Sequence, residues 1–158
     1  RQNILTPEWA RLGLGISLSD GNLIIVQEFS TNELTATDLN NYKTELLNGI
    51  NNKRSSNNLS QLINASQLES AAKSLNDKTI ISEAEITNSD FTNTLQTNNI
   101  FGSSQLIGRN GNPWKTILDS LITEETALFQ SMWKLIGIDI QTDKNGKINT
   151  VIIVNDND

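Results

Sequence analysis

The sequence predicts an α+β domain preceded by a β-hairpin segment. Two observations support this fold class: several segments repeat their apolar residues every three or four positions, as amphipathic helices do, and two segments carry apolar runs on either side of a turn. The chain has 158 residues, which is enough for one domain with a hydrophobic core and a short additional segment. We therefore expect the main domain over residues 31–158 and the hairpin segment over residues 1–30.

The clearest predicted helix covers residues 66–76. Its apolar side chains are spaced so that they share one face, which should be buried: Leu68, Ala71, Ala72 and Leu75. Ser66 and Glu69 have the S-x-x-E spacing of a capping box, in which two side chains satisfy free backbone groups of the first helical turn. This segment should therefore be a helix that packs against the core.

Further helices are expected on both sides of this one. An earlier helix is marked by four apolar or aromatic side chains and runs into the polar segment 51–58, where the pattern stops: Tyr42, Leu46, Leu47 and Ile50. A later helix should follow Asn112 as N-cap and Pro113 as first helical residue. Residues 90–96, with Asp90 as the cap, predict a short helix, and one or two turns are expected after Thr123. The glycine-rich residues 108–112 are predicted to be a loop.

Two segments are predicted to form β-hairpins. Residues 12–29 should turn at 19–22, and residues 134–154 should turn at 143–146, because glycine relieves the strain of the positive φ angles in tight turns. The two segments also repeat each other. The run W-A-R-L-G-L-G-I at 9–16 is similar to W-K-L-I-G-I-D-I at 133–140, and I-I-V follows in both, at 24–26 and 152–154. One repeat at this distance suggests the ends of two consecutive domains, with a boundary at residues 30–38.

Composition excludes several classes of function. The net charge of −6 and the pI near 4.6 argue against binding to nucleic acid or to an anionic membrane surface. The chain has no His and no Cys, which excludes His-based catalysis, Cys nucleophiles, His or Cys metal sites and disulfides. No apolar stretch approaches the roughly 20 residues of a membrane helix, so membrane insertion is not expected. Asn, Ser and Thr make up a third of the chain, as is common in exported proteins.

The motifs together resemble those of the CAP superfamily, which comprises cysteine-rich secretory, antigen 5 and plant pathogenesis-related proteins, and in particular its cysteine-free bacterial members. The run L-L-N-G-I-N-N-K-R at 46–54, the leucines that follow it, the helix at 68–72 and the tryptophan motif before the second hairpin carry the resemblance over about residues 40–155. It implies a three-layer α-β-α sandwich with a mainly antiparallel central sheet.

The resemblance also places three residues in the central cavity of the family. Glu83 and Glu124 fall where relatives have histidines, and Gln105 falls where they have a glutamate. In relatives, two histidines and two carboxylates can hold a divalent cation in this cavity. Because this chain has no histidine, the resemblance implies a degenerate cavity without catalytic residues, metal ligands or a cofactor.

Residues 1–9, R-Q-N-I-L-T-P-E-W, are similar to the tail motif H-R-x-x-L-L-x-P-x-W of the same family. Residues 1–30 are therefore predicted to be the terminal hairpin of an upstream CAP-like unit. A two-stranded hairpin is marginally stable alone, so it should dock on this chain's own sheet, on an upstream fragment or on another molecule. The candidate contacts are its apolar side chains: Leu12, Leu14, Ile16, Ile24, Val26 and Phe29.

These observations favour an extracellular or cell-surface module that is not an enzyme and that acts in surface display, adhesion or assembly. Its expected partner is another protein or a second copy of the chain, and a glycan or lipid ligand is a further possibility. One alternative is a carboxylate-based hydrolase or cation-dependent enzyme that uses acids gathered in one cleft: Glu83, Glu85, Asp90, Glu124 and Glu125. The other alternative is a lipid or sterol carrier with an apolar cavity lined by four large side chains: Trp114, Phe129, Met132 and Trp133.

Overall fold

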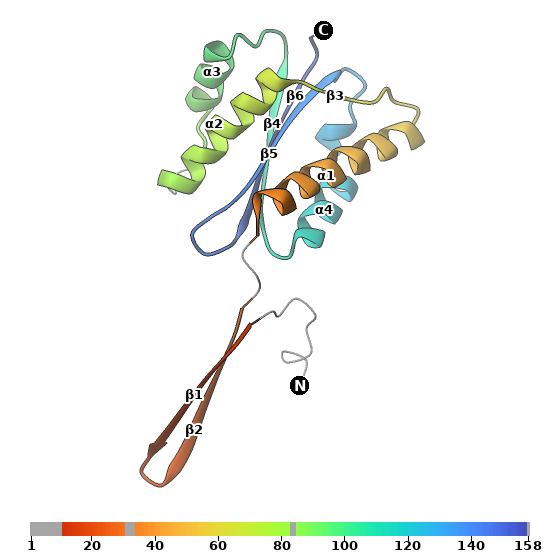
Figure 1. The fold of residues 1–158 in the computed structure, drawn as a ribbon. Coiled ribbons are helices and arrows are strands. Elements are labelled where there is room, and N and C mark those ends of the chain that lie inside the picture. The colour runs from red at the N-terminus through yellow and green to blue at the C-terminus, as the bar shows by residue number, and fades with distance from the viewer. Residues whose placement is uncertain (1–10, 31–33, 83–84, 158) are drawn as a thin grey trace. The chain divides into compact units, whose positions relative to one another are not determined.

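The computed structural model describes residues 11–30, 34–82 and 85–157. The chain divides into two compact units, Arg1–Leu34 and Thr35–Asp158. The described part of the first unit is an antiparallel hairpin of β1 (Arg11–Ser19) and β2 (Asn22–Ser30). Its two-residue turn has positive φ at Asp20 (51°) and Gly21 (76°), as a tight hairpin turn requires. The first predicted hairpin is therefore confirmed (Figure 1).

A four-stranded sheet forms the centre of the second unit. Its strand order is β3-β5-β6-β4. The short strand β3 (Ile63–Asn64) pairs in parallel with β5 (Leu135–Thr142), and the other two pairings are antiparallel, with β6 (Ile148–Asn155) between β5 and β4 (Ser104–Gly111). The mainly antiparallel sheet and the second hairpin, β5–β6, were both predicted from the sequence.

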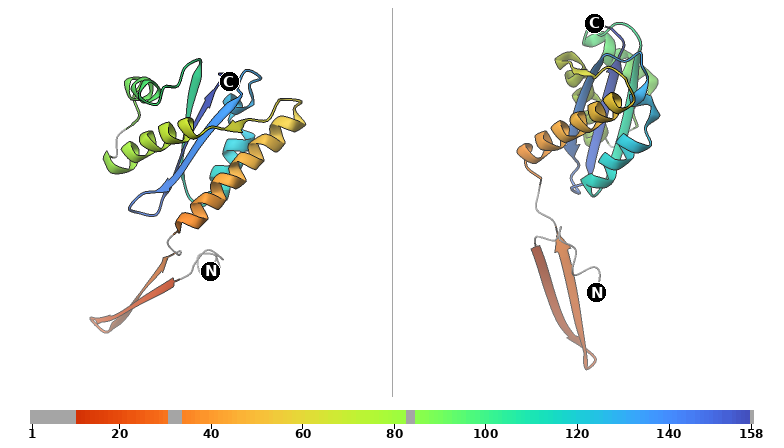
Figure 2. Two further views of the ribbon diagram at one scale, coloured as in Figure 1. Left: turned by 45° about the horizontal axis from the view of Figure 1, so that its top comes forward. Right: turned by 90° about the vertical axis from the view of Figure 1, so that its right-hand side faces the viewer.

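Helices cover both faces of this sheet. On one side lie α2 (Ser66–Ser82), which packs against β5 and β6, and α3 (Asn88–Thr97), which contacts α2. On the other side lie α1 (Ala36–Ser56) and α4 (Trp114–Thr123), which contact each other (Figure 2). A 3₁₀ helix, Thr126–Phe129, follows α4 and supplies the turn expected after Thr123. The unit is thus the predicted three-layer sandwich.

The strands bury both of their faces because side chains alternate along each strand. On the face under α2, one cluster contains side chains from the helix and from β6: Leu68, Ala71, Ala72, Leu75, Val151 and Ile153. On the opposite face, the intervening residues of β5 and β6 are buried: Ile136, Ile138, Ile140, Ile152 and Val154. Buried residues of α1 and α4 cover that face: Leu46, Ile50, Ile117 and Leu121.

Gly137 allows the closest approach between a helix and the sheet. It lies on β5 directly opposite Ile153, under the first turn of α2. A Cβ atom on Gly137 would overlap the backbone of Leu68 and Glu69. The glycine in the tryptophan motif therefore has a packing role, because any side chain there would push α2 away from the sheet.

Arg54 holds two loops to the end of α1. Its side chain is fully buried, and the guanidinium donates hydrogen bonds to the backbone carbonyls of Ser60 (2.7 Å), Leu128 (2.7 Å), Gln130 (3.1 Å) and Trp133 (3.1 Å). Burial lowers the pKa of this guanidinium. The planar fork of arginine suits this task because it presents five N–H donors in fixed directions. This contact explains why α1 continues to Ser56, through most of the polar segment 51–58 in which the apolar pattern stops.

Several predicted helix starts were wrong in detail. Ser66 is the first residue of α2, and the Glu69 side chain forms an ion pair with Lys43 rather than a capping box. The N-cap of α4 is Pro113, while Asn112 donates its side-chain amide to the carbonyl of Gly146 (3.2 Å).

Two other findings differ from the sequence predictions. Thr87 is the N-cap of α3, and Asp90 is the third residue of that capping box rather than the cap itself. Residues 108–111 belong to strand β4, so the loop predicted over 108–112 is wrong for all but its last residue. Strand β4 was missed because its sequence, S-Q-L-I-G-R-N-G, contains few β-branched or aromatic residues.

Candidate functional site

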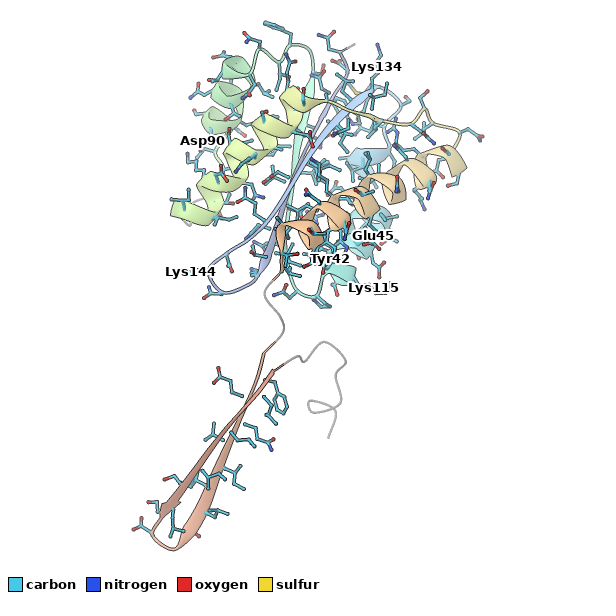
Figure 3. All side chains as sticks on the ribbon, viewed as in Figure 1. Tyr42, Glu45, Asp90, Lys115, Lys134 and Lys144 are labelled. Atoms are coloured by element: carbon cyan, nitrogen blue, oxygen red, sulfur yellow. The ribbon has the colours of Figure 1, made fainter. Side chains whose placement is uncertain are left out.

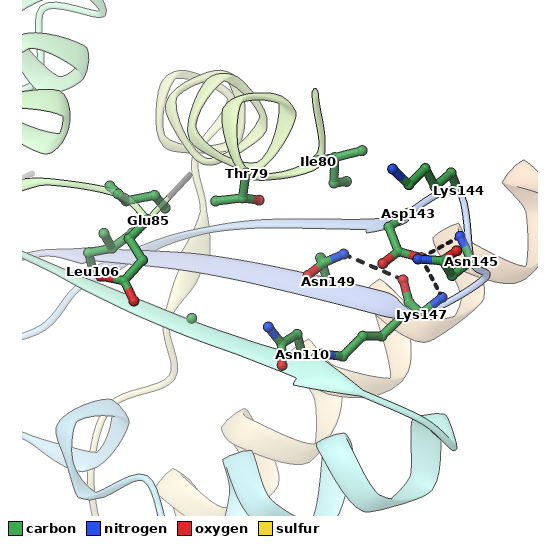
Figure 4. Close-up of a pocket in the computed structure, with 12 residues that line it drawn as sticks. Thr79, Ile80, Glu85, Leu106, Asn110, Asp143, Lys144, Asn145, Lys147 and Asn149 are labelled. Carbon is green, nitrogen blue, oxygen red and sulfur yellow. Dashed lines mark hydrogen bonds between the residues drawn. The ribbon is translucent and has the colours of Figure 1, made fainter. Parts of the chain in front are cut away.

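An open groove of about 590 Å³ lies on the α2 side of the sheet, between the C-terminal end of α2, strand β4 and the β5–β6 turn (Figure 4). Polar and charged side chains form one part of its lining: Thr79, Glu85, Asn110, Asp143, Lys144, Asn145, Lys147 and Asn149. Apolar side chains form the other part: Ile80, Ile86 and Leu106. The groove therefore offers both hydrogen-bonding and apolar groups to solvent.

The two acids that line this groove, Glu85 and Asp143, lie toward opposite ends of it (Figure 4). Asp143 accepts hydrogen bonds from the backbone N–H groups of Asn145 (2.8 Å) and Lys147 (2.9 Å), so its carboxylate shapes the β5–β6 turn. Glu85 comes from the other side, beyond α2. Among the described residues, no three His, Cys, Asp or Glu side chains lie close enough together to hold a metal ion.

A buried polar network lies beside the groove. Asn76 of α2 is fully buried and donates its amide to the Asp139 carboxylate (2.9 Å) and to the carbonyl of Asn149 (3.2 Å). Gln141 extends the network by donating to Asp139 (2.8 Å) and to Asp77 (2.6 Å). The bonds from Lys73 and then from Gln141 lower the pKa of Asp77. These partners join α2 to the sheet, and sequence reasoning did not single them out.

The three predicted cavity positions can be followed only in part. Glu83 lies outside the described residues. Gln105 is on β4 opposite Val154, on the sheet face turned away from the groove. Glu124 is the C-cap of α4 and accepts a hydrogen bond from the Ser120 hydroxyl (2.9 Å). Neither Gln105 nor Glu124 lines the groove, and their membership of one degenerate cavity stays a prediction.

The remaining acids of the hydrolase alternative have local partners. Asp90 forms an ion pair with Lys78 and a capping box with Thr87, and these bonds, the one from Lys78 first, lower its pKa to about 2. Glu125 accepts a hydrogen bond from Arg109 (2.7 Å) and caps the 3₁₀ helix. Asp90 and Glu125 thus stabilise local structure.

Of the four residues of the carrier alternative, Trp114 and Trp133 are buried in the core, whereas Phe129 is half-buried and Met132 is 43% exposed. Trp114 stacks on Tyr42 with a ring separation of 4.6 Å and donates its indole N–H to Glu45 (2.7 Å). Tyr42 and Glu45 both project from α1 toward α4 (Figure 3). Trp133 is buried and donates its indole N–H to the carbonyl of Ala127 (2.8 Å). Neither tryptophan lines the groove.

The hairpin of the first unit has two unequal faces. Its register pairs Leu14 with Gln27, Ile16 with Ile25 and Leu18 with Leu23, so these side chains share a face with Leu12. We call the aliphatic side chains of this surface the apolar hairpin face: Leu12, Leu14, Ile16, Leu18, Leu23 and Ile25. Each is 54–74% exposed.

The six predicted contact residues of the hairpin do not all lie on this face. Ile24 and Val26 point to the opposite side, because Ile24 pairs with Ser17 and Val26 pairs with Gly15. Phe29 pairs with Leu12 on the apolar side and is half-buried. Three members of the face were missing from the prediction, Leu18, Leu23 and Ile25. Strand alternation and the two-residue turn could have identified them.

The unit Thr35–Asp158 has the fold of a CAP domain, which confirms the fold that the sequence resemblance implied. Solved structures similar to this chain include a cysteine-rich secretory protein from Staphylococcus aureus, with a TM-score of 0.65 and 20% identity. An outer surface protein from Borrelia burgdorferi has a TM-score of 0.64 and 18% identity. An extracellular protein with an SCP domain from Bacillus anthracis has a TM-score of 0.63 and 14% identity.

The extent of these matches differs. The match to the Staphylococcus aureus protein covers 80% of this chain and 42% of that protein, and the match to the Bacillus anthracis protein covers 84% and 46%. The match to the Borrelia burgdorferi protein covers 77% of this chain and 96% of that protein. The chain thus spans less than half of two of these proteins and contains a CAP-like domain that resembles bacterial extracellular and surface proteins.

No family model and no curated protein matches the sequence. Among the described residues, no helix combines the length and apolar character needed to cross a bilayer.

Proposed function

We propose that this chain is an extracellular module that is not an enzyme, that it acts in surface display, adhesion or assembly, and that it binds a protein through the apolar hairpin face. One observation carries the proposal: six aliphatic side chains, each more than half exposed, lie together on one side of a two-stranded hairpin. An isolated exposed leucine is ordinary, whereas a contiguous aliphatic surface marks an interaction site.

The free energy available from covering this face supports a stable contact. Full burial of one Leu or Ile side chain contributes about 1.5–3 kcal/mol. Because each of the six is only partly exposed, we take about half of that range, which gives roughly 5–9 kcal/mol for the whole face before the costs of association. A two-stranded hairpin is marginal in water, so its partner would also stabilise its folded form.

The second unit supports the view that the module is not an enzyme. The chain has no His or Cys, and the acids described above cap helices, shape a turn or pair with lysine and arginine. The extracellular location is supported by the similar structures, two of which are described as an outer surface protein and an extracellular protein.

Site-specific photo-crosslinking in the producing cells tests this proposal. A photoreactive amino acid is placed at Ile16, on the apolar hairpin face, or at Ile24, on the opposite face, as the matched control. We expect one defined protein adduct from position 16 that is absent from position 24 and that a membrane-impermeant reagent labels on intact cells. Equal adducts at both positions, no adduct at position 16, or an adduct protected inside the cell would contradict the proposal.

A further inference from the structure

The two hairpins of the chain have the same register. Each residue of β1 corresponds to the residue 124 positions later on β5, as the tryptophan motif indicates. The pairs Leu12–Phe29 and Leu14–Gln27 then correspond to Ile136–Val154 and Ile138–Ile152, so each residue of β2 matches the residue 125 positions later on β6. This relation holds for every residue pair of β5–β6, from Leu135–Asn155 to Thr142–Ile148. The segment between the strands is longer in the second hairpin, with residues 143–147 against residues 20–21.

The shared register corrects the alignment of the second strands. The I-I-V runs at 24–26 and 152–154 are not equivalent, because Ile24 corresponds to Asn149 and Val26 to Val151. The equivalence instead rests on the tryptophan motif, on the strand pairing and on the alternation of apolar residues.

Equivalent positions show what each hairpin face is built to contact. The apolar hairpin face corresponds to the face of β5–β6 that α1 and α4 cover, since Leu12, Leu14 and Ile16 match the buried isoleucines of β5: Ile136, Ile138 and Ile140. On the other face, Gly13 matches Gly137, the glycine on which the backbone of α2 lies. The hairpin thus carries both the aliphatic face and the glycine that a CAP-type helix packing requires.

We propose that the hairpin is the last strand pair of a second CAP-type domain, and that its partner is a CAP-type scaffold that lacks this pair. An α2-type helix would lie on Gly13, helices of the α1 and α4 type would cover the apolar hairpin face, and a β4-type strand would pair with the outer edge of β2. This inference rests on the docking role proposed above and names its partner.

The scaffold of this chain is not the best fit for the hairpin. In this chain, β5–β6 already fills the place between α2 on one side and α1 and α4 on the other. If the hairpin took that place, Gln27 and Glu28 would replace Ile152 and Ile153, which are both fully buried. An amide or a carboxylate in these positions is costly unless it is hydrogen-bonded. The expected partner scaffold therefore carries polar or basic groups opposite Gln27 and Glu28, and a second copy of this chain is a poorer partner.

A graft tests whether the hairpin fits a CAP-type scaffold in this register. In the full chain, residues 135–155 are replaced by residues 11–30 carrying Gln27→Ile and Glu28→Ile, which match the Ile152 and Ile153 sites. A second graft uses residues 10–31 with the same two changes, so that the strand pairing is kept and every side chain moves to the opposite face. Two more variants of the first graft carry Gly13→Ala or, as the matched control, Gly15→Ala, at the position of Asp139.

We expect cooperative thermal unfolding from the first graft and from its Gly15→Ala variant, and no cooperative transition from the shifted graft. The Gly13→Ala variant should melt at least roughly 10 °C lower, because its methyl group meets the α2 backbone. Equal stability of the first and shifted grafts, failure of the first graft to fold, or an unchanged Gly13→Ala variant would overturn the inference.

Sedimentation of the unmodified chain separates this inference from the proposed function. One double variant, Leu14→Ser with Ile16→Ser, changes the apolar hairpin face, and the matched control, Ile24→Ser with Val26→Ser, changes the opposite face. If the chain dimerises and only the first double variant abolishes the dimer, the apolar hairpin face binds a second copy. Docking through that face would then stand, and the CAP-type scaffold as partner would be wrong. A monomer together with a foldable in-register graft is the result that the inference predicts.

Discussion

The contact between α2 and Gly137 gives the sharpest test of the packing. Gly137→Ala adds a single methyl group, which would overlap the backbone of Leu68 and Glu69. A flexible side chain could rotate away, whereas backbone in the first turn of α2 can yield only if the helix shifts over its cluster with Val151 and Ile153. Overpacking of this kind costs about 1–3 kcal/mol, and we expect the upper end of that range because the obstacle is backbone.

The assay for Gly137→Ala is thermal and urea unfolding of the full chain, followed by far-UV circular dichroism. A loss of about 3 kcal/mol should lower the melting temperature by roughly 10 °C and leave the urea m-value unchanged. Gly108→Ala is the matched control, because a Cβ at Gly108, on strand β4 of the same sheet, meets no atom within 4 Å. If both variants unfold at the parental temperature, α2 does not lie on Gly137 as described, and the equivalence of Gly13 loses its basis.

The remaining predictions concern a buried cation, a capping acid and the metal alternative. Arg54→Lys keeps the charge, but lysine cannot reach four carbonyls at once, so the free energy of unfolding measured with urea should fall by about 2–4 kcal/mol. The control Arg109→Lys changes a partly exposed ion pair and should lower this free energy by less than about 1 kcal/mol. Asp90 has a pKa lowered from 3.8 to about 2, so its contribution to stability is present above pH 4 and is lost as the pH falls toward 2. The melting temperatures of the parent and Asp90→Asn should therefore differ at pH 5 and converge near pH 2, and a constant difference would contradict this assignment. Millimolar calcium, magnesium or zinc should leave the melting temperature unchanged, since a cation bound only by the folded chain must raise it; a saturable rise would restore the cation-dependent alternative.

The fold was predictable because its long elements have strong local patterns. The apolar spacing of Leu68, Ala71, Ala72 and Leu75 identified α2, and glycine turns between apolar runs identified both hairpins. These signals depend on neighbouring residues alone, so they survive without knowledge of the tertiary structure. The resemblance then supplied the layer order, which the local patterns do not contain.

The elements that the sequence failed to indicate depend on distant partners. Strand β4 has a polar sequence and forms because β6 offers it a complete ladder from Asn155 to Ile148. The last turn of α1 persists because Arg54 is anchored by carbonyls 74–79 residues away. The predicted capping box at Ser66 failed because α2 already begins at Ser66, with the Glu69 N–H donated to the carbonyl of Ala65, and the Glu69 carboxylate pairs with Lys43 of α1.

The sequence by itself determined the α+β class, the two hairpins and the residue types that exclude histidine and cysteine chemistry, because composition and local periodicity are properties of the chain. Tertiary structure decided which side chains share a face and which share a cavity. It placed Ile24 and Val26 on the opposite face of the hairpin from Leu14 and Ile16, and it showed that Gly137 lies under a helix. Strand register and helix packing fix these relations, and they arise only when distant segments meet.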